Sequence, residues 1–129
     1  MKKEILKMKA IVIDPFEHKV FEVDIKNRGD SCCKDIYKHI HCDLFTAVYL
    51  DTGTEHTRDV MFVDDEGLYR TPNNQPYQAF FQTRWYPDPL AGYGIICGGD
   101  EEGETAPCSL TVEEVKEAIT SWSLTILEV

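Results

Sequence analysis

The stretch PLAGYGIICGGDEEGE, residues 89–104, combines two residue types that often bind ligands, glycine and carboxylate. Glycines that follow a strand and open a helix can cradle a phosphate with their backbone amides. Here Gly92 and Gly94 instead introduce the apolar run 93–97, and carboxylates, which would repel a phosphate, follow it. We therefore expect a strand that is flanked on both sides by sharp glycine turns.

The carboxylates of this stretch, and those of the turn at residues 64–67, also have the chemistry of a hard-cation site. Their spacing lacks the alternating oxygen ligands and the distal bidentate glutamate of a calcium loop. We therefore expect solvated acidic loops without a metal ion. Together with two glutamates of a later helix, these loops would form an acidic face for a basic partner. The expected face consists of Asp64, Asp65, Glu66, Asp100, Glu101, Glu102, Glu104, Glu113 and Glu117.

Cysteines and histidines gather between residues 32 and 42, and zinc accepts both as ligands. The candidates are Cys32, Cys33, His39, His41 and Cys42. Adjacent cysteines cannot easily reach one tetrahedral ion, and the sequence has no CxxC pair. We expect a buried Cys33 and exposed histidines, with zinc as the alternative.

Residues 73–86, NNQPYQAFFQTRWY, mix hydrogen-bonding groups with aromatic rings. That composition suits stacking of a nucleobase or anchoring of a protein partner. A nucleotide site would use Asn74, Tyr77, Arg84, Trp85 and Tyr93. The alternative interpretation places Phe80, Phe81 and Trp85 in the core, because a small domain needs its large side chains inside.

The sequence contains no nucleophile elbow, HExxH motif, phosphate-binding loop or kinase-type catalytic loop. Cys97 lies in an apolar run and is expected in the core rather than as a nucleophile. We therefore expect a protein that is not an enzyme and has no cofactor.

These residues must be positioned by a chain of 129 residues, which fits one domain, and its net charge is −10. Met8 is a second candidate start, so we expect an extension at residues 1–7 and one domain at residues 8–129. Strands are expected at residues 9–14 and 19–25, as a hairpin, and at 43–51, 59–67 and 93–97. A short helix or strand is expected within 78–85, and a final strand or tail at 123–129. The strand near residue 47 is apolar on both faces, which predicts a central position in the sheet.

Two helices complete this pattern. The first is expected within residues 29–42, with Cys33, Ile36, Tyr37 and Ile40 on one face. The second is expected at residues 111–120, where Thr111 and Glu114 form a capping box. Its buried stripe would contain Val112, Val115, Ala118 and Ile119. The fold class is therefore α+β, with a mainly antiparallel or mixed sheet of about five to six strands.

The five cysteines are an odd number, and no signal peptide or bilayer-spanning apolar run is present. We expect reduced thiols in a cytoplasm, with no membrane association. The acidic charge argues against direct binding of nucleic acid.

Five short motifs together resemble a family of small uncharacterised proteins found mostly in bacteriophages, prophages and mobile elements. They are the strand at residues 8–13, the FV-DEG strand and turn at 61–67, the Pro-Asn step at 72–74, the glycine-flanked strand at 92–98 and the acidic loop at 100–104. The resemblance covers residues 8 to about 119, and it implies an origin in mobile elements and no transferable catalytic residues.

The leading hypothesis is a non-enzymatic counter-defence inhibitor whose acidic face binds a basic, nucleic-acid-binding host protein. The alternative is a protein that sequesters a nucleotide signal, and a metal-dependent enzyme ranks last. Homo-oligomerisation is left open.

Overall fold

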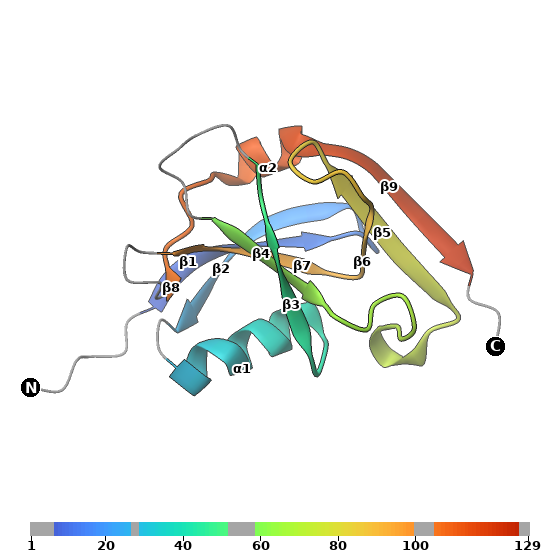
Figure 1. Ribbon diagram of the computed structural model, residues 1–129, viewed down its shortest axis with the longest axis horizontal. Helices are drawn as coiled ribbons and strands as arrows, with labels where there is room; N and C mark the ends of the chain where they lie inside the picture. The colour runs from blue at the N-terminus through green and yellow to red at the C-terminus, as the bar shows by residue number, and fades with distance from the viewer. Residues whose placement is uncertain (1–6, 27–28, 52–58, 100–104, 127–129) are drawn as a thin grey trace, which may run out of the picture.

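The computed structural model describes residues 7–26, 29–51, 59–99 and 105–126 (Figure 1). The chain begins with β1 (Lys7–Asp14), β2 (Lys19–Lys26), α1 (Gly29–Ile40), β3 (Phe45–Tyr49) and β4 (Val60–Asp64). It continues with a short 3-10 helix η1 (Pro72–Asn74), β5 (Tyr77–Thr83), β6 (Leu90–Ala91) and β7 (Gly94–Gly99). It ends with β8 (Thr105–Ala106), α2 (Val112–Ala118) and β9 (Ile119–Ile126).

The strands form two sheets in which every pairing is antiparallel. The large sheet has six strands, in the order β2-β1-β7-β4-β3, with β8 paired to the end of β7. The small sheet has three strands, in the order β6-β5-β9. The predicted α+β class with two α-helices is therefore confirmed, and the large sheet has the expected size. The strand alternatives expected within residues 78–85 and at residues 123–129 are present as β5 and β9, but their pairing in a separate small sheet was not predicted.

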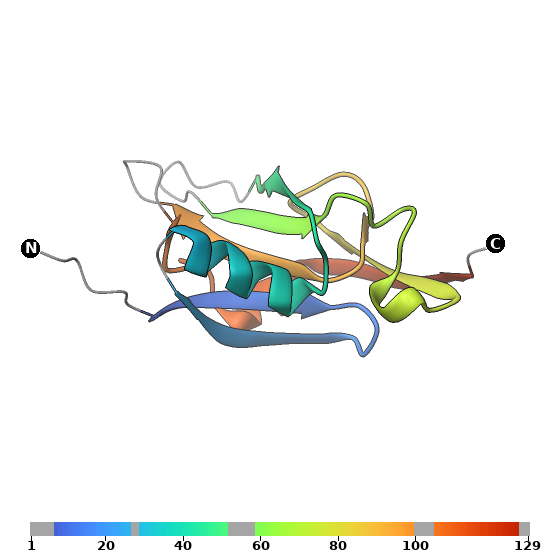
Figure 2. The ribbon, with the colours of Figure 1, turned by 90° about the horizontal axis from the view of Figure 1, so that it is seen from below.

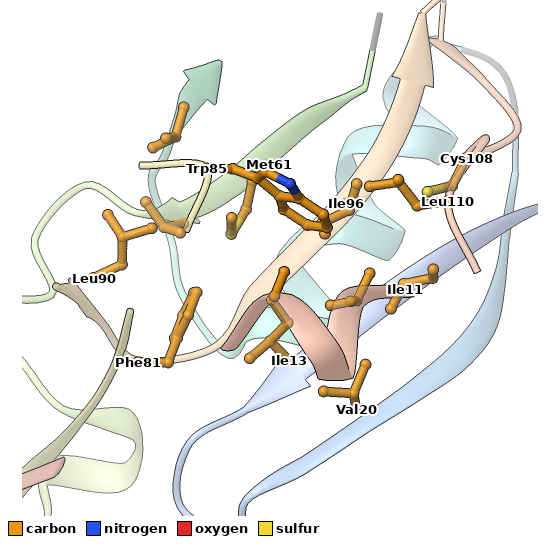
Figure 3. Close-up of a cluster of buried hydrophobic side chains, with 14 residues drawn as sticks. Ile11, Ile13, Val20, Met61, Phe81, Trp85, Leu90, Ile96, Cys108 and Leu110 are labelled. Atoms are coloured by element: carbon orange, nitrogen blue, oxygen red, sulfur yellow. The ribbon is translucent and has the colours of Figure 1, made fainter. Parts of the chain in front are cut away.

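The large sheet separates two hydrophobic cores. On one face, Met8, Ala10 and Val12 of β1 pack with Ile36 and Ile40 of α1. On the other face, alternate residues of the same strand pack beneath the small sheet and α2 (Figure 3). This second core contains Ile11, Ile13, Val20, Met61, Phe81, Trp85, Ile96, Leu110, Val115 and Ala118. Figures 1 and 2 show α1 and α2 on opposite sides of the large sheet.

Two sequence-based predictions about these elements are wrong. The strand at residues 45–49 is not central, because β3 is the terminal strand of the large sheet and Tyr49 is 79% exposed. Its two apolar faces arise because Phe45 packs on the α1 side while Val48 enters the other core. In α1, Ile36 and Ile40 are buried as predicted, but the first member of the stripe is Cys32, four residues before Ile36, rather than Cys33, which is exposed.

The second helix begins as predicted. The Thr111 side chain accepts a hydrogen bond from the Glu114 amide, and the Glu114 carboxylate accepts one from the Thr111 amide, both at 3.1 Å. Val115 and Ala118 are fully buried, and Val112 and Ile119 are packed beside them. The helix ends at Ala118, two residues earlier than predicted, because β9 starts at Ile119 and pairs with β5.

The glycines before β7 have structural roles. Gly92 has a φ of +78°, a backbone conformation that other residues rarely adopt. At Gly94 a methyl group would lie 2.8 Å from Cζ of Phe81 and 2.9 Å from Sδ of Met61. The glycine therefore lets the ring of Phe81 pack directly on β7, in agreement with the expected strand rather than a phosphate cradle.

Candidate binding surface

A hollow of about 700 Å³ lies between the β1–β2 turn, α2 and β9. Its lining includes the buried Val20, the ring of His18, and Trp122 of β9. The imidazole of His18 stacks on the indole of Trp122, with ring centroids 5.0 Å apart and planes 7° apart. The hollow therefore lies between residues from the beginning of the sequence and residues from its end.

The β1–β2 turn is held by Asp14, which is itself buried. One carboxylate oxygen of Asp14 accepts hydrogen bonds from the amides of Phe16, at 2.9 Å, and Glu17, at 3.2 Å. This is the side-chain mimicry of a backbone turn that aspartate favours. His18 follows with a φ of +57°, and the arrangement places its ring against Trp122.

Two exposed ion pairs border this hollow. Nζ of Lys19 lies 2.7 Å from Oε2 of Glu17, and Nζ of Lys116 lies 3.6 Å from Oε1 of Glu113. The hydrogen bond between these two side chains lowers the pKa of the Glu17 carboxyl group and raises the pKa of the Lys19 amino group. Solvent-exposed pairs of this kind contribute little to stability, so either partner can exchange for a ligand group.

Exposed carboxylates lie on β2 and α2, along the two elements that contribute Phe21 and Lys116 to the lining of the hollow. The register pairs Glu22 with Ile11 and Asp24 with Lys9, so both acids lie on the face of the large sheet that α2 covers. On α2, Glu113 and Glu117 are exposed, and the helix packs next to β2. We call this set, Glu22, Asp24, Glu113 and Glu117, the β2–α2 acidic surface.

The other predicted acidic residues do not join this surface. Asp64 is the last residue of β4, and Asp65 and Glu66 begin the turn after it, where Arg70 pairs with Asp43 at 3.1 Å and with Glu66 at 3.6 Å. Burial raises the pKa of Asp64. The beginning of β4 lies near α2 instead. There the carboxylate of Asp59 accepts hydrogen bonds from both the amide and the hydroxyl of Ser109. The acidic turn and α2 are therefore at opposite ends of β4.

The remaining acids of the expected face are Asp100, Glu101, Glu102 and Glu104, and these lie outside the described residues. The flanking residues Gly99 and Thr105 pair with each other at one end of β7. Gly94, at the other end of β7, pairs with Val63 beside the acidic turn. Among the described members of the expected face, the acidic turn after β4 and the glutamates of α2 lie in different parts of the molecule.

The expected nucleotide site is also divided. Arg84 and Trp85 line a smaller hollow of about 400 Å³, but the Trp85 side chain is only 7% exposed and belongs to the core. Tyr77 and Tyr93 instead meet through Phe16, with ring centroids 6.1 and 5.2 Å from that ring. β5 separates the two groups, and seven residues of strand at 3.3 Å each correspond to roughly 20 Å. Asn74 lies on η1 with a φ of +53°.

The cysteines and histidines near α1 are likewise spread out. His39 is half-buried rather than exposed, and burial lowers its pKa. The ring centroids of His41 and Tyr93 are 4.7 Å apart. Burial raises the pKa of the Cys42 thiol to about 12. In the described ranges, no three His, Cys, Asp or Glu side chains are grouped to hold a metal ion.

Burial also raises the pKa of Cys97, as expected of a core thiol. Sequence reasoning missed His18, Lys19 and Trp122 as candidate binding residues. The turn DPFEHK was recognisable, but nothing local indicates that it meets residue 122.

A family model described as a domain of unknown function, DUF3846, matches residues 8–123. This chain belongs to the DUF3846 family. The match spans most of the chain, as does the resemblance proposed from the short motifs. No curated protein and no solved structure gave a significant match to this DUF3846 chain. Within its described part, neither α-helix is long and apolar enough to cross a bilayer.

Proposed function

We propose that this DUF3846 domain is a non-enzymatic binding protein that captures a basic segment of a protein partner across the β2–α2 acidic surface and the adjoining hollow. The observation that carries the proposal is the convergence there of exposed carboxylates from two elements beside a stacked aromatic pair. Carboxylates steer and bind basic groups, and an indole is a favoured anchor for a lysine or arginine side chain.

The setting that we propose follows from the motif resemblance to phage and prophage proteins. In a bacterial cytoplasm, a partner of this type would be a host defence protein whose basic groove normally holds a phosphate backbone. The net charge of −10 supports such competition, because it favours encounter with a positive surface over encounter with nucleic acid.

A second candidate, sequestration of a nucleotide, is supported by a different feature of the hollow. Lys19 and Lys116 border it, and the His18–Trp122 stack presents flat rings on which a base can pack. Glu17 and Asp14 in the same lining oppose an anionic ligand. The two carboxylates and two lysines of the lining cancel, and the four further carboxylates of the β2–α2 acidic surface favour a basic segment over an anionic nucleotide.

Titration of the tryptophan fluorescence separates the two candidates, because Trp122 lines the hollow whereas Trp85 is buried in the core. We expect an oligoarginine peptide to bind with an affinity that falls at least about tenfold between low and high salt, as screening predicts. ATP should give no saturable signal. Saturable binding of ATP without binding of the peptide would favour the nucleotide instead.

A matched pair of variants then tests the location. The double substitution Glu22→Lys with Glu117→Lys spans β2 and α2, and we expect it to weaken peptide binding by about tenfold or more. The double substitution Asp65→Lys with Glu66→Lys changes the net charge equally but lies on the turn after β4. It should weaken binding by less than about threefold. Equal losses would mean that overall charge alone attracts the peptide, and would overturn the assigned surface.

A further inference from the structure

The two sheets expose terminal strands that differ in their protection against pairing with another strand. β2 carries Lys19, Glu22, Asp24 and Lys26 among its eight residues. β3 has five residues, and β6 has two. Charged and short strands are the usual ways in which proteins protect a free edge.

β9 has neither protection. Its eight residues, ITSWSLTI, include no charged residue, proline or glycine, and are rich in strand-forming types. One side of β9 pairs with β5 along almost its whole length, and no described strand pairs with its other side. An uncharged edge of this length is a template for another strand.

The second half of β9 also exposes large apolar side chains. The register places Trp122, Leu124 and Ile126 opposite Phe81, Ala79 and Tyr77, so all of them lie on one face of the small sheet. Trp122 is packed beside the core, but Leu124 is 59% exposed and Ile126 is 80% exposed. The end of β9 therefore lies outside the core, and Figure 1 shows β5 and β9 extending past the end of the large sheet.

We propose that β9 pairs antiparallel with β9 of a second copy of this chain, about a twofold axis at Leu124. This register places Leu124 opposite Leu124, and Trp122 opposite Ile126 of the second copy. Ser123 then lies opposite Thr125. Apolar residues thus meet apolar residues on one face, and hydroxyls meet on the other, which is the pairing that stabilises sheets.

The charge distribution favours a second copy at this position. Two chains with a net charge of −10 repel each other over most of their surfaces, but residues 119–126 contribute no charge to that repulsion. A twofold contact must be complementary to itself, and the register about Leu124 meets that condition.

The dimer would continue the small sheet across both copies, in the order β6-β5-β9-β9-β5-β6. Ile126 of the second copy would then lie beside Trp122, which lines the hollow of the first. Each copy would border the hollow of the other. The dimer does not depend on the proposed function, but it would place two candidate binding surfaces in one particle.

The proposed contact is confined to one strand of each copy, whereas specific stable interfaces usually bury at least roughly 1,200 Å². We therefore expect a dimer that dissociates on dilution, and sedimentation velocity of the full chain over a concentration series measures it. The mass should rise from the monomer value of 14.8 kDa towards twice that value. A monomer at every concentration up to several hundred micromolar would overturn the proposal.

Substitutions at the twofold position test the register. Leu124→Lys places two like charges opposite each other and should raise the dissociation constant by at least about tenfold. Leu124→Glu should do the same, whereas an equimolar mixture of the two variants should recover the dimer. The control Tyr49→Lys, at an exposed position on the terminal strand β3, should leave dimerisation unchanged. Loss of the dimer in the control alone, or no recovery in the mixture, would contradict pairing through β9.

Discussion

The two faces of the large sheet are covered in different ways. On one face a single helix of 12 residues, α1, packs its stripe of Ile36 and Ile40 over β1 and β7. On the other face the cover is composite, with the small sheet over one part and the seven-residue helix α2 over another. The large hollow, the β2–α2 acidic surface and the free edge of β9 all lie on the composite side.

This difference separates a face with one continuous cover from a face whose cover leaves a hollow. The helix α1 packs against β2, β4 and β7 as one element. On the other face the cover consists of a helix and a sheet, and the hollow lies between Lys116 of α2 and Trp122 of β9. Substitutions on the two faces test whether the two cores contribute equally to the free energy of unfolding.

The largest effect is expected from a charge introduced into either core. Val115→Asp and Ile36→Asp each bury an unpaired carboxylate at a position that is at most 2% exposed. We expect each to lower the free energy of unfolding by at least about 3 kcal/mol, or to prevent folding. Urea denaturation measures the change, and Cys33→Asp on the exposed side of α1 is the control. A tolerated Val115→Asp would mean that α2 does not cover a true core.

A smaller effect is expected where the small sheet approaches the large one. Gly94→Ala forces a methyl group against the Phe81 ring and the Met61 sulfur, and should cost about 1–3 kcal/mol. The denaturation midpoint reports this cost. Adding Phe81→Leu should reduce the penalty of Gly94→Ala compared with its cost in the wild-type background. Simple additivity of the two substitutions would mean that the ring is not the obstacle.

The cap of α2 comes next. Thr111→Ala removes the acceptor for the Glu114 amide and should destabilise the domain by about 1 kcal/mol. Because α2 is only seven residues long, we also expect weaker protection of its amides in hydrogen exchange. Thr111→Ser keeps the hydroxyl and is the matched control. Equal behaviour of the two variants would contradict a role for the cap.

The smallest effect on stability is expected at the exposed thiol. Cys33→Ser should change the free energy of unfolding by less than about 0.5 kcal/mol, as is usual for surface positions.

Burial raises the pKa of Cys42 and Cys108 from 9.0 to about 12, so these thiols stay protonated at pH 9 in the folded state. A thiol reagent at that pH should therefore modify Cys33 first, and Cys33→Ser should remove the fast phase. Rapid modification of Cys108 would show that the composite face opens readily.

The same protonation has a consequence for stability at high pH. In the unfolded chain these thiols ionise near pH 9, whereas in the folded chain they bind their protons up to about pH 12. The unfolded state thus releases protons first, and the free energy of unfolding should fall as the pH rises from 9 to 12. Cys108→Ala should make this fall less steep in a denaturation series.

Local signals in the sequence were sufficient for part of the fold. The capping box at Thr111 and Glu114 involves residues three positions apart, and the hairpin of β1 and β2 joins neighbouring segments, so both could be predicted. The central position of the strand near residue 47 was predicted wrongly, because an apolar residue on each face does not reveal whether a neighbouring strand exists on each side. Exposure of Tyr49 depends on that missing neighbour.

The candidate site depends on contacts between distant segments and was therefore less predictable. Composition identified Trp85 as a ligand residue or a core residue, and only the packing places it in the core. The sequence identified the acidic residues, but it did not show that they lie at opposite ends of β4, because that placement depends on the order of the strands in the sheet. The stack of His18 on Trp122 joins positions that no local pattern connects.

The direct junction between α2 and β9 links the motions of these two elements. Ile119 caps the helix through a hydrogen bond from its amide to the carbonyl of Lys116, and it is also the first residue of the strand. The carbonyl of Ala118 accepts a hydrogen bond from the amide of Arg84, which anchors the junction to the end of β5. No loop separates the helix from the strand, so unwinding of α2 cannot be absorbed between them. Slow amide exchange should therefore be lost from both elements together, as one cooperative unit of local opening.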